Sequence, residues 1–199
     1  MKHIAIFDGL RGVLALWVFT FHVASISGFM LPKLFDGRHA VSVFFVLSGF
    51  VISKLTMERN DSYYVFIVRR FFRLYPVYLV CLVIALLFVN FGAMPINFDQ
   101  KYTFEHVISH LFMAHGFFPI DVLPGADSAI LNPAWSVSVE WQFYIIAPIF
   151  FMLLRSRSRW GLVIFVLAIV ISKRFFSNFF NLGAASILSQ IPIFFIGIC

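Results

Sequence analysis

Two ionisable residues lie in the first apolar segment of the chain, FDGLRGVLALWVFTFHV, which covers residues 7–23. Arg11 and His22 are eleven residues apart, so a helix places both side chains on nearly one face, about 16 Å apart along its axis. Arg11 either extends to the lipid headgroups or serves a site. His22 lies deeper, where a histidine needs a partner or a hydrated cavity, and this depth indicates a function.

An acidic residue occurs in another apolar segment, NPAWSVSVEWQFYIIAP, which covers residues 132–148. Glu140 lies one to two turns into the predicted helix, near its outer end and at a depth similar to that of His22. A buried carboxylate requires a charged or hydrogen-bonding partner. A His22–Glu140 pair would raise the basicity of the imidazole and hold its tautomer, as general-base catalysis on a hydroxyl requires. Similar depth is the basis of this hypothesis.

Arginines gather in VRRFFRLYP, residues 68–76, directly before a further apolar segment. Arginines at the end of a membrane helix commonly mark its cytoplasmic side. Arg70 and Arg73 also suit a phosphate clamp, because a guanidinium group matches the geometry of phosphate oxygens. A cytoplasmic phosphorylated donor such as coenzyme A fits this second interpretation.

Two other patterns favour a structural interpretation. His106 and His110 are four residues apart in FEHVISHLFMAHGFF, residues 104–118, and would share a helix face. This spacing is a weak indication of a metal site without a third ligand, so we expect ordinary histidines at the membrane interface. Ser48 and Gly49 in VFFVLSGFVIS are small residues that allow helices to pack closely.

The composition indicates the elements that position these residues. Hydrophobic residues make up 61% of the 199-residue chain and charged residues only 12%. These proportions and the recurring apolar runs predict an all-α, polytopic transmembrane protein. No basic tail suited to nucleic acid is present, and we expect no nucleic-acid partner.

The apolar runs predict about six membrane helices, since one helix needs about 20 apolar residues to span a bilayer. Trp135, Trp141 and Tyr144 are typical of an interfacial aromatic belt. The fifth run is only 13 residues long before Lys173 and Arg174, and it spans only if these two side chains extend to the headgroups or the following aromatic segment contributes. The predicted spans cover residues 10–29, 40–56, 74–93, 132–154, 160–172 and 184 onward.

Basic residues predict the orientation of the chain. An N-terminus in the cytoplasm assigns ten basic residues to the inner segments and five to the outer ones, so we expect this orientation. The inner set comprises Lys2, Arg11, Lys54, Arg59, Arg69, Arg70, Arg73, Arg155, Arg157 and Arg159, and the outer set Lys33, Arg38, Lys101, Lys173 and Arg174.

Four segments together resemble the membrane-bound acyltransferase family 3, which includes the O-acetyltransferases of O-antigen and other cell-surface glycans. FDGLRGVLALWVFTFH resembles the first helix of that family, with its arginine and histidine at Arg11 and His22. FFVLSGFVIS resembles the second helix, RRFFRLYP the Arg-x-x-Arg segment at Arg70 and Arg73, and WSVSVEWQFY the segment around Glu140. The resemblance implies that residues 1–199 are one transmembrane acyltransferase domain, the N-terminal part of a bundle of about ten helices.

The resemblance also implies transfer of an acyl group, usually acetyl, from cytoplasmic acyl-coenzyme A to a hydroxyl of a lipid-linked or exported glycan. Arg70 and Arg73 would hold the phosphates of the donor, with assistance from Arg11. His22 would deprotonate the acceptor hydroxyl or carry the acyl group, and Glu140 would orient His22 or line the acceptor site. No metal is implied, and the protein would be integral to a cell membrane, in bacteria the inner membrane.

Two other functions use the same residues. A proton-coupled or small-molecule transporter would use the intramembrane charges as a transport path. Such transporters often contain internal repeats, and the sequence shows none. In a non-catalytic membrane scaffold, Arg11 would extend to the headgroups and His22 would serve packing.

Overall fold

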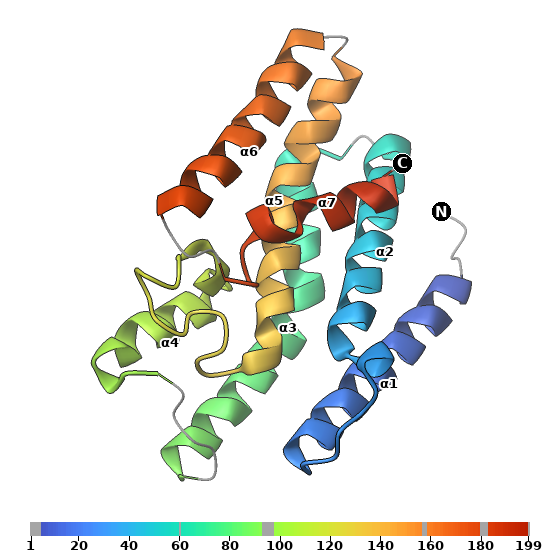
Figure 1. Ribbon diagram of the computed structural model, residues 1–199. Coiled ribbons are helices and arrows are strands. Elements are labelled where there is room, and N and C mark those ends of the chain that lie inside the picture. Colours follow the sequence, from blue (N-terminus) through green and yellow to red (C-terminus); the bar gives the residue numbers. More distant parts are fainter. Residues whose placement is uncertain (1–4, 60, 93–97, 157–158, 180–182, 199) are drawn as a thin grey trace. The chain divides into compact units, whose positions relative to one another are not determined.

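Helices joined by turns and short 3-10 segments make up the protein (Figure 1). The computed structural model describes residues 5–59, 61–92, 98–156, 159–179 and 183–198, and no strand occurs among them. Within these residues, five helices are long and apolar enough to cross a membrane, while α4 (Thr103–Leu111) and α7 (Ile187–Ile198) are shorter. The five are α1 (Ala5–Ile26), α2 (Gly37–Glu58), α3 (Tyr63–Asn90), α5 (Trp135–Arg155) and α6 (Arg159–Phe179). The prediction of an all-α, polytopic membrane protein is confirmed.

The third membrane helix begins at Tyr63 and not near residue 74. Ser62 caps its first turn, because the Ser62 hydroxyl accepts a hydrogen bond from the Val65 amide. Arg70 and Arg73 therefore lie inside α3, and the prediction that they precede the helix is wrong. Long arginine side chains can extend from an apolar helix to polar surroundings, which explains why these charges do not end it.

Two other helix ends also differ from the predicted spans. α1 ends at Ile26 because Gly28 takes a left-handed conformation, with a φ of 71°, and the Phe29 amide donates to the Ala24 carbonyl. α6 continues past Lys173 through the following aromatic segment to Phe179. The fifth predicted span therefore gains its length from the aromatic segment, which is the second of the two conditions given for it above.

The chain divides into two compact units, and the first comprises residues up to Lys54 and those from Pro192. Its core joins α1 to α2 through Leu14, Ala40 and Leu47. α2 also packs against the last turns of α7, where the Phe45 and Phe194 rings stack. A Cβ atom added at Gly49 would lie 2.2 Å from the Phe194 carbonyl oxygen, so this contact requires glycine. The predicted packing role of Gly49 is confirmed.

The second unit comprises residues Leu55–Ile191. In this unit α5 packs against both α3 and α6, and α4 packs against α3. The core includes Tyr78 and Leu82 of α3 and Met113 of the segment after α4. Three 3-10 segments, Gln100–Tyr102, His115–Phe117 and Asn132–Ala134, lie along the connection between α3 and α5.

Candidate functional site

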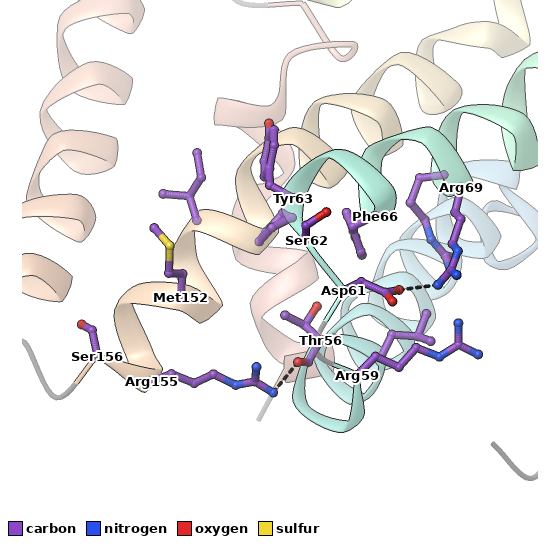
Figure 2. Close-up of a pocket in the computed structure, with 14 residues that line it drawn as sticks. Thr56, Arg59, Asp61, Ser62, Tyr63, Phe66, Arg69, Met152, Arg155 and Ser156 are labelled. Atoms are coloured by element: carbon purple, nitrogen blue, oxygen red, sulfur yellow. Dashed lines mark hydrogen bonds and ion pairs between the residues drawn. The ribbon is translucent and has the colours of Figure 1, made fainter.

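A cavity of about 730 Å³ opens in the second unit (Figure 2). Its lining combines apolar side chains of α3 and α5 with four arginines and one aspartate. The charged residues are Arg59, Arg69, Arg70, Arg155 and Asp61. Because four positive charges face one negative charge, the cavity favours an anionic ligand.

The exposed arginines of the cavity come from three different segments, as Figure 2 shows. Arg59 follows the end of α2. Arg69 lies on α3 and forms an ion pair with Asp61, with 2.5 Å between Nη1 and Oδ2. Arg155 lies in the last turn of α5 and donates hydrogen bonds of 2.5 and 2.7 Å to the carbonyls of Thr56 and Met57. Arg155 thereby ties the end of α5 to the end of α2.

Arg70 is the half-buried arginine of the cavity. Its guanidinium carbon lies 5.7 Å from the centre of the Phe66 ring and 5.8 Å from the centre of the Tyr144 ring, so both rings contribute cation–π contacts. Nε and Nη1 of Arg70 are buried and have no hydrogen-bond partner among the described residues. The Arg70 guanidinium group therefore keeps hydrogen-bond donors that the described residues do not use.

Tyr144 connects Arg70 to Glu140. Its side chain is only 2% exposed, so the prediction that it belongs to an interfacial belt is wrong. The Tyr144 hydroxyl donates a short hydrogen bond to Oε1 of Glu140, one turn away on α5. Arg70 and Arg73 both interact electrostatically with Tyr144. The structure therefore brings together Arg70, Arg73 and Glu140, and adds Tyr144 to them.

A second face of α5 holds the connection between α3 and α5 in place. Ser138 donates to the Met113 carbonyl at 2.9 Å and accepts from the Gly116 amide at 3.1 Å. Gln142, one turn later, donates to the Ala185 carbonyl at 2.8 Å and accepts from the Ile187 amide. The WSVSVEWQFY segment thus makes two separate sets of contacts, since residues 138 and 142 share one face and residues 140 and 144 share another.

His22 and Arg11 lie in the first unit, on the uninterrupted helix α1, and both are half-buried. Nδ1 of His22 lies 2.8 Å from the Val18 carbonyl. Because a carbonyl only accepts hydrogen bonds, this contact requires the proton on Nδ1, and the neutral ring keeps its lone pair on Nε2. In this tautomer Nε2 can accept a proton, as a general base must. The His22–Glu140 pair joins residues of different units and stays a prediction.

Three histidines after α3 are fully buried, and the expectation that His106 and His110 are interfacial is wrong. The chain turns after α4 and stacks the His115 ring on the His110 ring, with 4.2 Å between the ring centres. Burial lowers the pKa of His110 to about 4 and the pKa of His115 to about 3. Backbone carbonyls of His106 and Ala134 occupy one nitrogen of each ring. Among the described residues no group of three potential ligands is placed to bind a metal.

Comparisons with known proteins connect this arrangement to other chains. The family model described as an acyltransferase domain matches residues 4–199. The chain is 31% identical over 187 residues to the acyltransferase MdmB of Streptomyces mycarofaciens, which covers 88% of this chain and 47% of the relative. It is 31% identical over 160 residues to the peptidoglycan O-acetyltransferase OatA of Listeria monocytogenes, which covers 76% of this chain and 24% of the relative.

A phage protein adds a third relative. The chain is 31% identical over 159 residues to the O-acetyl transferase of Shigella phage Sf6, which covers 72% of this chain and 44% of the relative. The matched region is less than half the length of each of these three relatives. No solved structure matches the chain.

Proposed function

The chain belongs to the membrane-bound acyltransferase family 3, and from this membership we propose that it transfers an acetyl group from cytoplasmic acetyl-coenzyme A to a carbohydrate hydroxyl outside the cytoplasm. Two relatives are named as O-acetyltransferases, one of them for peptidoglycan, and their names support a glycan acceptor. Membership of an acyltransferase family favours the enzyme over the transporter and the scaffold.

The arginine-lined cavity is the observation that carries the proposal. Its half-buried Arg70 presents two buried nitrogens without a partner among the described residues, which suits a ligand rich in phosphate oxygens. Arg73, one turn further along α3, adds a charge near the same place. In this proposal Arg70 and Arg73 bind the donor phosphates, and Arg11 assists.

His22 acts as the base in the proposed reaction. Its Nε2 accepts the proton of the acceptor hydroxyl while the hydroxyl oxygen attacks the thioester carbonyl. The new C–O bond forms, the C–S bond breaks, and the proton passes from His22 to the departing thiolate. A covalent acyl-histidine intermediate fits the same residue, since imidazole is also a nucleophile. Glu140 orients His22 or lines the acceptor site.

The proposed location is the cell membrane, in bacteria the inner membrane, with the N-terminus in the cytoplasm. Ten basic residues against five support this orientation. Contacts in the second unit support a common side for four of the ten, because Arg59, Arg69, Arg70 and Arg155 line one cavity. The donor then enters from the cytoplasm, and membrane lipids surround the apolar helices.

Radiolabelled acetyl-coenzyme A tests the proposal, since this donor does not cross membranes. We expect inverted vesicles that contain the protein and its glycan acceptor to incorporate label, and right-side-out vesicles to incorporate none. Vesicles without the protein serve as the control. Absence of label in the glycan of inverted vesicles would overturn the proposal.

A further inference from the structure

The arginines of the cavity form two groups that differ in exposure. Arg70 is half-buried against the Phe66 and Tyr144 rings. Arg59 and Arg69 are exposed and line the same cavity. We call this second pair the mouth arginines. The cavity therefore offers guanidinium groups at two levels. The Arg70 group lies in its interior, and the groups of the mouth arginines lie where the cavity meets solvent.

Arg155 also lines the cavity but has a different task. Its guanidinium group donates to the carbonyls of Thr56 and Met57. These contacts fix the end of α2, from which the chain leads directly to Arg59. Arg155 is therefore a positioning residue for this end of the cavity, and we leave it out of the ligand-binding set.

Both mouth arginines are associated with the segment between α2 and α3. Arg59 lies on that segment, and the Arg69 side chain extends from α3 to Asp61 (Figure 2). The Arg69 and Asp61 side chains are 51% and 26% exposed. An ion pair this exposed is weak, so a phosphate group with about two charges can replace the Asp61 carboxylate.

We propose that Arg59 and Arg69 bind the phosphomonoester on the ribose of the donor, while Arg70 binds its diphosphate. The inference rests on the proposed function, because it takes acyl-coenzyme A as the donor. In that molecule the diphosphate lies between the thioester and the ribose phosphomonoester. When the thioester points into the membrane, the diphosphate lies deeper and the phosphomonoester nearer the solvent. This order matches the half-buried Arg70 and the exposed mouth arginines.

The inference makes the donor site selective for coenzyme A over its analogue without the ribose phosphate. Each charge-assisted hydrogen bond that a phosphate gains at an arginine strengthens binding by roughly tenfold. Asp61 weakens binding of the complete donor, because its carboxylate repels the phosphate and competes for Arg69. Removing that carboxylate should therefore favour coenzyme A more than the analogue.

Calorimetric titration of the detergent-purified protein with coenzyme A and with dephospho-coenzyme A tests this assignment. We expect the wild type to bind coenzyme A at least about tenfold more tightly, because Arg59 and Arg69 each add a charge-assisted hydrogen bond while Asp61 competes for Arg69. The Arg59→Gln/Arg69→Gln variant should bind both ligands alike, near the wild-type affinity for dephospho-coenzyme A. Arg174→Gln, which changes an exposed arginine of α6, should keep the preference. Asp61→Asn should increase the preference several-fold.

The outcomes separate this inference from the proposed function. Equal affinity of the wild type for both ligands would overturn the role of the ribose phosphate and leave coenzyme A as the donor. A preference that persists in Arg59→Gln/Arg69→Gln would overturn the assignment to the mouth arginines. Absence of binding of either ligand by the folded wild type would overturn both proposals. Size-exclusion chromatography checks that each variant remains folded and monodisperse.

Discussion

The Tyr144 hydroxyl donates a hydrogen bond to the Glu140 carboxylate, and the ring of the same tyrosine lies under the Arg70 guanidinium group. One buried side chain thus contacts both the carboxylate of the WSVSVEWQFY segment and an arginine of the cavity. The two contacts use different parts of Tyr144. Because of this division, substitutions can separate the support of Glu140 from the support of Arg70.

Tyr144→Phe removes the hydroxyl and keeps the ring. We expect the turnover number to fall by about tenfold, because Glu140 loses the hydrogen bond from the Tyr144 hydroxyl. The KM for acetyl-coenzyme A should not change, since the ring still packs against Arg70. Steady-state kinetics with Tyr144→Leu as the comparison checks this, because loss of the ring should raise KM as well. An unchanged turnover number in Tyr144→Phe would contradict the role of the hydroxyl.

Arg70→Lys keeps the charge and removes the planar guanidinium group. A lysine cannot stack on the Phe66 and Tyr144 rings in the same way or bind phosphate through two parallel hydrogen bonds. We expect the KM for acetyl-coenzyme A to rise by about tenfold. Arg174→Lys on α6 is the matched control and should behave as the wild type. A wild-type KM in Arg70→Lys would show that charge alone suffices at this position.

The buried histidines predict that stability falls in acid. The pKa of His110 is lowered to about 4 and that of His115 to about 3, against about 6.5 in the unfolded chain. Both pKa values are lower in the folded state, so their contribution is complete above pH 6.5 and declines as the pH falls. Between pH 7 and pH 5 the free energy of unfolding should decrease by roughly 2 kcal/mol for each histidine.

Thermal unfolding in detergent at the two pH values measures this effect. The wild type should show a lower Tm at pH 5 than at pH 7. His110→Gln/His115→Gln removes both titrating groups, so its Tm should depend much less on pH. An equal fall of Tm in the wild type and in this variant would assign the acid sensitivity to other groups.

Gly116→Ala should destabilise the protein. An added Cβ atom would lie 2.1 Å from the Ala185 carbonyl oxygen and 2.5 Å from Nε2 of Gln142, so the hydrogen bonds of Gln142 must rearrange. Overpacking of this kind costs about 1–3 kcal/mol. Gly12→Ala is the control, because its added Cβ would have no atom within 4 Å apart from its chain neighbours and the nearby backbone of its own helix. A Tm for Gly116→Ala equal to that of Gly12→Ala would contradict this account of the contact.

The sequence predicted the membrane helices well, because length and apolar composition are local properties. It misplaced the start of α3, because the arginines of residues 69–73 directly precede the apolar run and indicate a segment outside the membrane helix. The Ser62 cap was the signal that could have corrected it, because serine before a helix commonly accepts a hydrogen bond from the first turn. Arg70 was therefore expected at the membrane surface and not in a half-buried position.

Tyr144 and Gln142 were missed for a different reason. Aromatic residues near the end of a membrane helix commonly form an interfacial belt, and nothing local to Tyr144 shows that α3 covers it. The i, i+4 spacing of Glu140 and Tyr144 was the available signal. The hydrogen bonds of Gln142 to Ala185 and Ile187 join residues more than 40 positions apart, so no local pattern could predict them.

Acetyl transfer by a His22→Ala variant tests the central claim most directly. Inverted vesicles that contain wild type, His22→Ala or His39→Ala receive radiolabelled acetyl-coenzyme A, and label in the glycan is measured over time. His39 is an exposed histidine of α2 and serves as the matched control. We predict that His22→Ala loses at least about a hundredfold of the wild-type rate while His39→Ala keeps it. Transfer by His22→Ala at the wild-type rate, with equal protein in the membrane, would contradict His22 as the catalytic base.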